Sequence, residues 1–392
     1  MFLTLLNREF LHHLKSARFS VITVLCLVVV VLFTWIHALG YIANPPDVSD
    51  KLKQVTPLTI MLTGVELSQP DNPVRAKFPL PRFSDVIRLL FSLLAILMTY
   101  DAICGDKERG VLRLVFSSPV KRGIALLAKW ASAYIVTLLP LVLAFMLALI
   151  IANLRGALPL SGENLARLAA VFIYVAIYMG FFTGIGLAIS ATAHRPGTAM
   201  PVALVTWFCF VFIIPSTGYL LARWISPVPS MKLITYQQNY RDDFLEDRMR
   251  VKLMDSSLSE DDKRAIRDDY YRSDLQQRSQ LKASYLRSRF GLIQAAKVIC
   301  RLSPSFSLSY VAATMSGLGP DENVYQAREP GSDILTDESY RERFEETRVS
   351  YAQYPDLDQA LMKTLPDYIA GLAWMCLALA LAITLFIRYD VR

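Results

Sequence analysis

The sequence has few charged residues and few residues from which a catalytic centre is built. Asp, Glu, Lys and Arg make up only 19% of its 392 residues, and it contains four histidines and five cysteines. The histidines are scattered over different segments without the spacing of a metal site, and no CxxC, HExxH or GxSxG motif is present. These absences argue against a disulfide-stapled secreted domain, a metalloenzyme and a serine hydrolase. We expect no catalytic, metal or cofactor site in this chain.

What the sequence does contain is long apolar blocks. Hydrophobic residues account for 54% of the chain, the mean hydropathy is +0.36, and the apolar residues are gathered into six blocks. About 20 consecutive apolar residues are needed to cross roughly 30 Å of hydrocarbon. We therefore predict an all-α integral membrane protein with six transmembrane helices at about Val21–Tyr41, Val86–Cys104, Ile124–Leu154, Leu168–Ala193, Met200–Ile225 and Tyr368–Arg388.

Residues 1–18 are predicted to form an amphipathic helix that lies in the membrane interface. Phe2, Leu6 and Phe10 fall near one face, while the charged residues lie largely opposite. A cleaved signal peptide is the alternative, because residues 38–40 resemble a cleavage site. The long leading region, which contains Glu9, argues against it.

Lys and Arg in the short connecting segments predict the orientation. The segments before the first block, after the second, fourth and sixth blocks carry most of these residues and fall on one side of the membrane. By the positive-inside rule this side is cytoplasmic, as are both termini. The chain has a formal net charge of +7, but its basic residues lie beside apolar blocks or among acids, so we expect no nucleic-acid partner.

The fifth and sixth blocks are separated by a polar insertion, residues 226–364. In its first part, Leu245, Met249 and Leu253 recur at helical spacing, and a second helix is predicted from Ser259 to about Ala295 after a break. Two helices with narrow apolar stripes and a tight turn predict an extracytoplasmic helical hairpin. The domain prediction is thus residues 1–225, the insertion, and residues 365–392 with the last helix and a cytoplasmic tail.

The segment after the second block is the strongest candidate for a functional site. Its basic and apolar residues predict a short helix at the cytoplasmic interface that docks onto a soluble partner, and an ordinary positive-inside loop is the alternative. Gly105–Gly110 begins like a phosphate loop but lacks the Lys and Ser/Thr that hold phosphate and Mg²⁺, so we expect no nucleotide site. The candidate contact residues are Asp101, Lys107, Glu108, Arg109, Gly110, Arg113, Pro119, Lys121, Arg122 and Lys129.

Three further predictions concern Glu108, Asp101 and the glycines of the fourth span. Glu108 is predicted to orient the loop through Arg109 or Lys121, with direct partner contact as the alternative. Asp101 lies about a turn from the end of the second span, where an ionisable group needs solvent or a partner; the paired alternative joins it to Lys107 or Lys129. A small-residue face on the fourth span predicts close helix packing rather than a substrate path, and comprises Gly180, Gly184 and Gly186.

The same segment resembles the signature of ABC-2 type transporter permeases, the membrane subunits of type V ABC exporters. Glu108, Arg109, Gly110, Pro119 and Lys129 match positions of that signature, while a valine, residue 111, stands where threonine is commoner. The resemblance covers residues 1–225 and 365–392. The insertion is similar to the long extracytoplasmic segment of a bacterial subgroup that includes relatives of the permease for copper-site maturation of nitrous oxide reductase.

The resemblance implies a permease subunit in the bacterial inner membrane. It implies a dimer, formed with a second copy or a sister permease, and two soluble ATPase subunits that bind ATP and Mg²⁺ and contact residues 105–123. The expected activity is export of an amphiphilic, lipid-like or peptide substrate. The alternative is ATP-driven mechanotransmission through the external hairpin to a periplasmic or surface partner. A lipid-modifying membrane enzyme ranks last, because the chain supplies no cluster of His, Asp or Glu at one membrane depth.

Overall fold

The computed structural model describes residues 2–43, 83–112, 121–154, 161–254, 259–317, 319 and 356–388, and the regular elements within these ranges are helices. Six helical segments there are long and apolar enough to cross a membrane, which confirms the all-α prediction. Helix α1 (Phe2–Leu14) precedes them. The six segments are α2 (Ala17–Ala43); α5 (Phe83–Val86), η1 (Ile87–Phe91) and α6 (Ser92–Thr99) with α7 (Cys104–Glu108); α9 (Arg122–Leu154); α10 (Gly162–Thr192); α11 (Pro196–Phe208), η2 (Cys209–Ile213) and α12 (Ile214–Ile225); and α18 (Leu357–Arg388).

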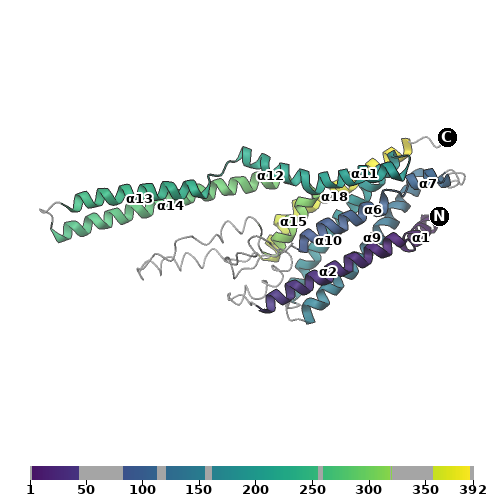
Figure 1. Ribbon diagram of the computed structural model, residues 1–392, viewed down its shortest axis with the longest axis horizontal. Helices are drawn as coiled ribbons and strands as arrows, with labels where there is room; N and C mark the ends of the chain where they lie inside the picture. Colours follow the sequence, from purple (N-terminus) through teal and green to yellow (C-terminus); the bar gives the residue numbers. More distant parts are fainter. Residues whose placement is uncertain are drawn as a thin grey trace. The chain divides into compact units, whose positions relative to one another are not determined.

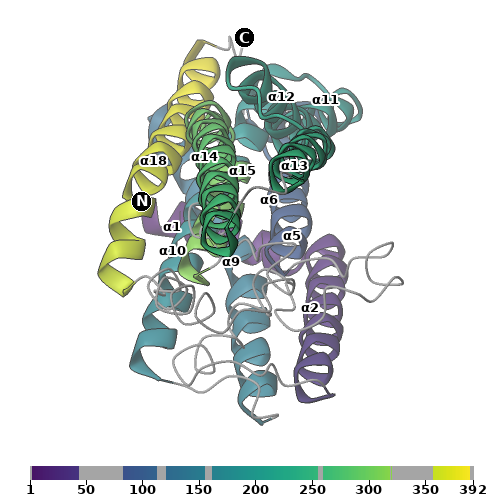
Figure 2. The ribbon, with the colours of Figure 1, turned by 90° about the vertical axis from the view of Figure 1, so that its left-hand side faces the viewer.

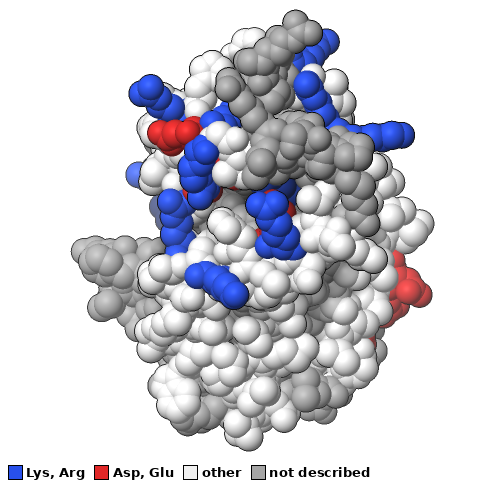
Figure 3. Space-filling model, turned by 90° about the vertical axis from the view of Figure 1, so that its right-hand side faces the viewer, with Lys and Arg blue, Asp and Glu red and all other residues white. Residues whose placement is uncertain are grey.

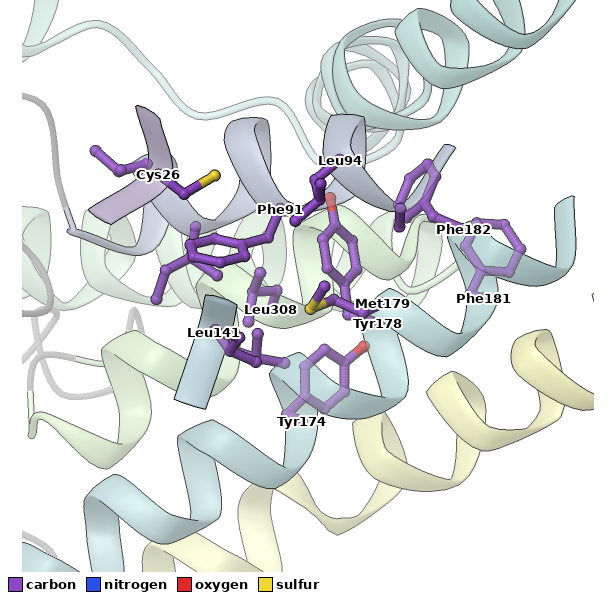
Figure 4. Close-up of a cluster of buried hydrophobic side chains, with 14 of the residues drawn as sticks. Cys26, Phe91, Leu94, Leu141, Tyr174, Tyr178, Met179, Phe181, Phe182 and Leu308 are labelled. Atoms are coloured by element: carbon purple, nitrogen blue, oxygen red, sulfur yellow. The ribbon is translucent and has the colours of Figure 1, made fainter. Parts of the chain in front are cut away.

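The chain forms two compact units. The first, here called the bundle unit, comprises Met1–Ser216 and Cys300–Arg392, and the second, the hairpin unit, comprises Thr217–Ile299. Within the bundle unit, α10 is the central helix and packs against α6, α9, α11, α15 (Pro304–Met315) and α18. Figure 4 shows the core around it, with Phe91, Leu94, Tyr174, Tyr178 and Leu308 packed together.

The glycines of α10 lie where neighbouring helices approach most closely. A Cβ atom added to Gly180 would meet the side chain of Met375 of α18, and one added to Gly184 would lie 3.0 Å from Cβ of Ala378 on the same helix. A Cβ at Gly186 would meet Thr99 of α6 and lie 3.5 Å from the Cα of Ile96. The structure therefore places all three predicted packing glycines at contacts within the bundle unit.

Replacing Gly186 by alanine is expected to destabilise the bundle by about 1–3 kcal/mol, because the added methyl group overlaps the buried Thr99 side chain. Thr99 cannot turn away freely, since its hydroxyl donates to the carbonyl of Ala95 at 2.8 Å. The thermal unfolding midpoint of the detergent-purified chain measures this loss. Gly162→Ala, at the start of the same helix and with open space around it, is the control and should not lower the midpoint.

The hairpin unit contains two long helices, α13 (Met231–Leu253) and α14 (Glu260–Cys300). Their starts are capped: the Ser230 hydroxyl accepts from the Leu233 N–H at 3.3 Å, and the Asp262 carboxylate accepts from the Ser259 N–H at 3.3 Å. The helices run alongside each other (Figures 1 and 2), and Arg241 donates to the Gln277 side chain at 3.3 Å. The predicted pair of helices is confirmed, and α14 ends about five residues later than expected; residues 255–258, where the break was predicted, lie outside the described residues.

The insertion predicted as one segment, residues 226–364, is divided between the two units. Helix α15 belongs to the bundle unit, where it packs against α10 and α18, and its Leu308, Val311 and Met315 are buried. Just before it, Arg301 donates to both carboxylate oxygens of Asp367 on α18, at 3.2 and 3.1 Å, and Ser307 donates to the same carboxylate at 2.9 Å. These bonds fasten α15 to the last transmembrane helix.

A proline explains how the start of α15 is attached to the fifth span. Pro215 has no N–H, so it cannot donate to the carbonyl of Val211, as an α-helical turn requires, or to that of Phe210, as a π-helical turn requires. The chain passes through this region as the π-helical turn η2. The hydroxyl of Ser303 donates to the carbonyl of Phe210 at 2.8 Å, and that of Ser305 donates to the carbonyl of Val211 at 3.5 Å. The two serine hydroxyls thus donate to the carbonyls that Pro215 cannot serve in either helical register.

Candidate functional site

The described parts of the predicted contact segment, residues 105–112 and 121–123, lie at one end of the bundle unit, together with α1 and the termini of several spans. Figure 1 shows α1 and α7 at this end, and Figure 3, which looks onto it, shows mainly Lys and Arg among the charged side chains. We call it the basic end. Its basic residues in the described ranges are Arg8, Lys15, Arg18, Lys107, Arg109, Lys121, Arg122, Arg195 and Arg388.

Helix α7 is held against the last turn of α10 by polar contacts in both directions. The backbone N–H groups of Ile103 and Cys104 donate to the buried hydroxyl of Ser190, at 2.9 and 3.0 Å. In return, the Lys107 ammonium donates to the carbonyls of Ala191 and Ala193 at the end of α10. A cation there satisfies carbonyls that have no helical donor and complements the negative end of the helix dipole. The position of α7 is therefore fixed by α10.

Lys129 connects three elements through its ammonium group. The residue is 8% exposed on α9, and its Nζ lies 2.7 Å from a carboxylate oxygen of Asp106 on α7 and 3.1 Å from one of Glu9 on α1. A second cation, Arg109, lies 3.9 Å from the other oxygen of Asp106. Because a buried ammonium needs anionic or hydrogen-bonding partners, these contacts tie the amphipathic helix, the second span and the third span together.

The partner of Asp101 is Arg18, and not one of the two lysines that the sequence offered as alternatives. Its carboxylate pairs with Arg18 at the start of α2, whose guanidinium also lies 5.7 Å from the centre of the Tyr100 ring. Lys107 and Lys129 bind other groups, so the alternative that paired Asp101 with either lysine is wrong. The reason is that Arg18 approaches from a segment 83 residues earlier in the chain, a proximity that local spacing does not reveal.

His13 of α1 lies beside the same cluster and is 9% exposed. Burial lowers the pKa of its imidazole below the usual 6.5, while the negative charge of nearby Glu9 partly opposes this shift. The imidazole is therefore neutral at pH 7. Helix α1 therefore contributes one charged group to this cluster, the Glu9 carboxylate that pairs with Lys129, and one uncharged group, the His13 imidazole.

The remaining predicted residues are exposed or lie outside the described ranges. Glu108, Arg109 and Lys121 are exposed, and among the described residues neither basic side chain is paired with Glu108, contrary to the predicted orienting role. Gly110 has φ of 69°, a left-handed conformation that ends the turn after α7 and that favours glycine. Arg122 donates to the carbonyl of Ile387 on α18 at 3.2 Å. Arg113 and Pro119 lie outside the described residues.

Sequence reasoning missed four residues of this site: Glu9, Arg18, Asp106 and Ser190. Three of them carry charges, and the signal that could have identified them is a carboxylate or guanidinium close to an apolar block. Among the described residues, no three His, Cys, Asp or Glu side chains are arranged to hold a metal ion. The arrangement positions α1, α7 and α9 and leaves Glu108, Arg109 and Lys121 exposed on its outer side.

The chain is similar in sequence to known transporter proteins. The model of a family described as ABC-2 family transporter protein matches residues 3–391. A probable ABC transporter permease protein, NosY, of Stutzerimonas stutzeri is 31% identical over 128 residues, which are 32% of this chain and 45% of the relative. NosY of Pseudomonas aeruginosa is 30% identical over 125 residues, with the same coverage. The match spans less than half the length of either relative. Because the family model covers nearly the whole chain, the protein belongs to the ABC-2 transporter family.

Proposed function

We propose that the chain is the transmembrane permease subunit of an ABC transporter and that residues 105–123 contact a separate, soluble ATPase subunit. The observation that carries this proposal is the buried Lys129, which binds carboxylates of α1 and α7 with one ammonium group. Because most of α7 lies within the contact segment, a force applied there reaches the amphipathic helix and two spans through one set of contacts. Family membership supports an ATPase as the source of that force.

In this proposal the basic end faces the cytoplasm of a bacterium and the spans lie in its inner membrane. The positive-inside rule supports this orientation, because the short basic connections meet at that end. The complex contains two ATPase subunits, which hold ATP and Mg²⁺, and a second permease copy or a sister permease. ATP binding would draw the ATPases together and displace α7, and the bundle would then rearrange.

The proposed cargo is amphiphilic, lipid-like or a peptide. Ionisable side chains in the described spans, such as Asp101, Lys129, Arg167 and Asp367, lie toward the ends of their helices, so the middle of each span is apolar. An apolar middle suits a substrate with a large apolar surface better than a small ion.

Mechanotransmission is the second candidate, and the attachment of α15 favours it. Arg301 and Ser307 fasten the chain that leaves α14 to Asp367 of α18, so a motion of the last span is passed to the segment that returns from the hairpin. ATP hydrolysis could then act on an external partner without transport. A purified complex whose ATPase responds to that partner, and which moves no cargo across vesicles, would support this candidate.

The test of the contact is co-purification of an ATPase with the tagged full-length chain from native membranes. Reversing the exposed charges with Glu108→Lys and Lys121→Glu is expected to reduce the recovered ATPase about tenfold, equivalent to ~1.4 kcal/mol of binding free energy. Arg264→Glu, an exposed position on α14, is the control and should recover the unmodified amount. Unchanged recovery with the reversed charges, or no ATPase with the unmodified chain, would contradict the proposal.

A further inference from the structure

Helix α13 has two apolar faces, although a hairpin needs only one. The first contains Ile234, which is buried, and the half-buried Leu245 and Met249, on the side toward α14. The second lies on the opposite side of the helix, at spacings of three, four and four residues. We call it the tyrosine stripe; its members and their exposed fractions are Leu233, 49%; Tyr236, 70%; Tyr240, 70%; and Phe244, 54%.

The charged residues beside the tyrosine stripe indicate what kind of surface packs against it. Asp243 and Arg248 flank Phe244 on opposite sides, and the Arg248 guanidinium lies 5.3 Å from the centre of the Phe244 ring. A helix face that binds the membrane surface is typically bordered by Lys and Arg, whereas this one is bordered by both signs. Mixed charges at the borders of an apolar stripe are typical of helix–helix contacts.

We propose that the tyrosine stripe packs against the same stripe of a second copy of this chain. Two copies inserted in one membrane with the same topology are related by a two-fold axis along the membrane normal, so identical residues meet. The proposal includes that α13 runs along this axis, so the two copies of α13 are parallel, and across a parallel helix pair the flanking residues that face each other are five positions apart. Asp243 and Arg248 have this separation and opposite charges, so the symmetric contact forms two ion pairs beside Phe244.

The size of the stripe determines how strong this contact is. From their exposed fractions, the three aromatic side chains offer on the order of 400 Å² per copy. A stable dimer of free proteins buries about 800 Å² per partner. The stripe alone therefore holds two soluble hairpins weakly, but confinement of both chains to one membrane raises their effective concentration and favours the contact.

Asp247 marks the end of the contact. It is exposed and lies one turn beyond Phe244 on the same face, where it would meet its own copy across the two-fold axis. Two like charges at that distance repel each other, so the packing ends before this residue. Asp247→Leu removes the repulsion and continues the stripe toward Val251, and it is expected to strengthen the association.

Cysteine cross-linking of the full-length chain in native membranes tests the proposal without any need for ATPase activity. With copper phenanthroline as oxidant, Tyr240→Cys is expected to give at least about fivefold more disulfide-linked dimer than Asn239→Cys, its exposed neighbour off the stripe, and than the unsubstituted chain with its native cysteines. Phe244→Cys should behave like Tyr240→Cys, and adding Asp247→Leu to either should raise the yield.

Equal yields at Tyr240 and Asn239 would overturn the proposal. So would a Tyr240→Cys product that joins this chain to a different protein, because the stripe would then serve another partner. Loss of the ATPase during purification with an unchanged cross-linking pattern would count against the proposed function alone.

Discussion

Replacing Lys129 by methionine is expected to destabilise the basic end by about 3 kcal/mol, the lower limit for removing one partner of a buried ion pair. Methionine retains the length of the side chain but leaves the carboxylates of Glu9 and Asp106 without the ammonium group that holds them together. The thermal unfolding midpoint should fall, and amide hydrogen exchange should increase in α1 first, because α1 reaches this cluster through Glu9.

The same variant separates ATPase attachment from force transmission. The exposed contact residues remain, so the ATPase should still co-purify, while ATP-driven output per ATP hydrolysed should drop at least tenfold. Lys121→Met removes an exposed lysine beside the first residue of the same helix, α9, and should change the free energy of unfolding by less than about 0.5 kcal/mol. A Lys129→Met midpoint equal to that of Lys121→Met would show that the cluster does not hold these elements together.

Neutralising the carboxylates along with the lysine should restore part of the loss. In the triple variant Glu9→Gln, Asp106→Asn and Lys129→Met no buried charge lacks a partner, and such replacements are often neutral or better than the broken pair. Stability should therefore recover while the output remains low, because polar contacts no longer tie α1 to α7.

Replacing Asp367 by asparagine is expected to cost about 3 kcal/mol. The carboxylate is fully buried and accepts three hydrogen bonds, two from Arg301 and one from Ser307, and an amide can accept through only one oxygen. Arg301 is one-quarter exposed, so water relieves part of its lost pairing and keeps the effect near the lower limit. Hydrogen exchange should rise in α15 and leave α1 unchanged.

Asp358→Asn is the matched control, since Asp358 is an exposed carboxylate in the first turn of the same helix. Its loss weakens only the interaction with the helix dipole, by less than about 1 kcal/mol. If both variants changed α15 equally, Asp367 would not be its anchor.

The sequence predicts those parts of the fold that depend on a local, repeating pattern of residues. Blocks of apolar residues predicted the six spans, and Leu245, Met249 and Leu253 predicted the packed face of α13, because hydropathy and helical spacing are local properties. The tyrosine stripe follows the same spacing and could have been found in the same way.

Long-range pairings could not be predicted. The partner of Asp101 is Arg18, and Asp367 takes Arg301, yet each residue has other opposite charges nearer in sequence. Which of them meet depends on how the helices pack, and packing of apolar side chains leaves no simple pattern in one sequence. The burial of α15 depends on long-range contacts in the same way, because Ser303 and Ser305 at its start donate to carbonyls of the fifth span.

The bond between Ser303 and the carbonyl of Phe210 joins the segment that leads toward the hairpin to the segment that returns from it. The two chain segments that flank the hairpin unit, before residue 217 and after residue 299, are therefore joined to each other within the bundle unit. The two segments therefore cannot separate at this point without breaking that hydrogen bond.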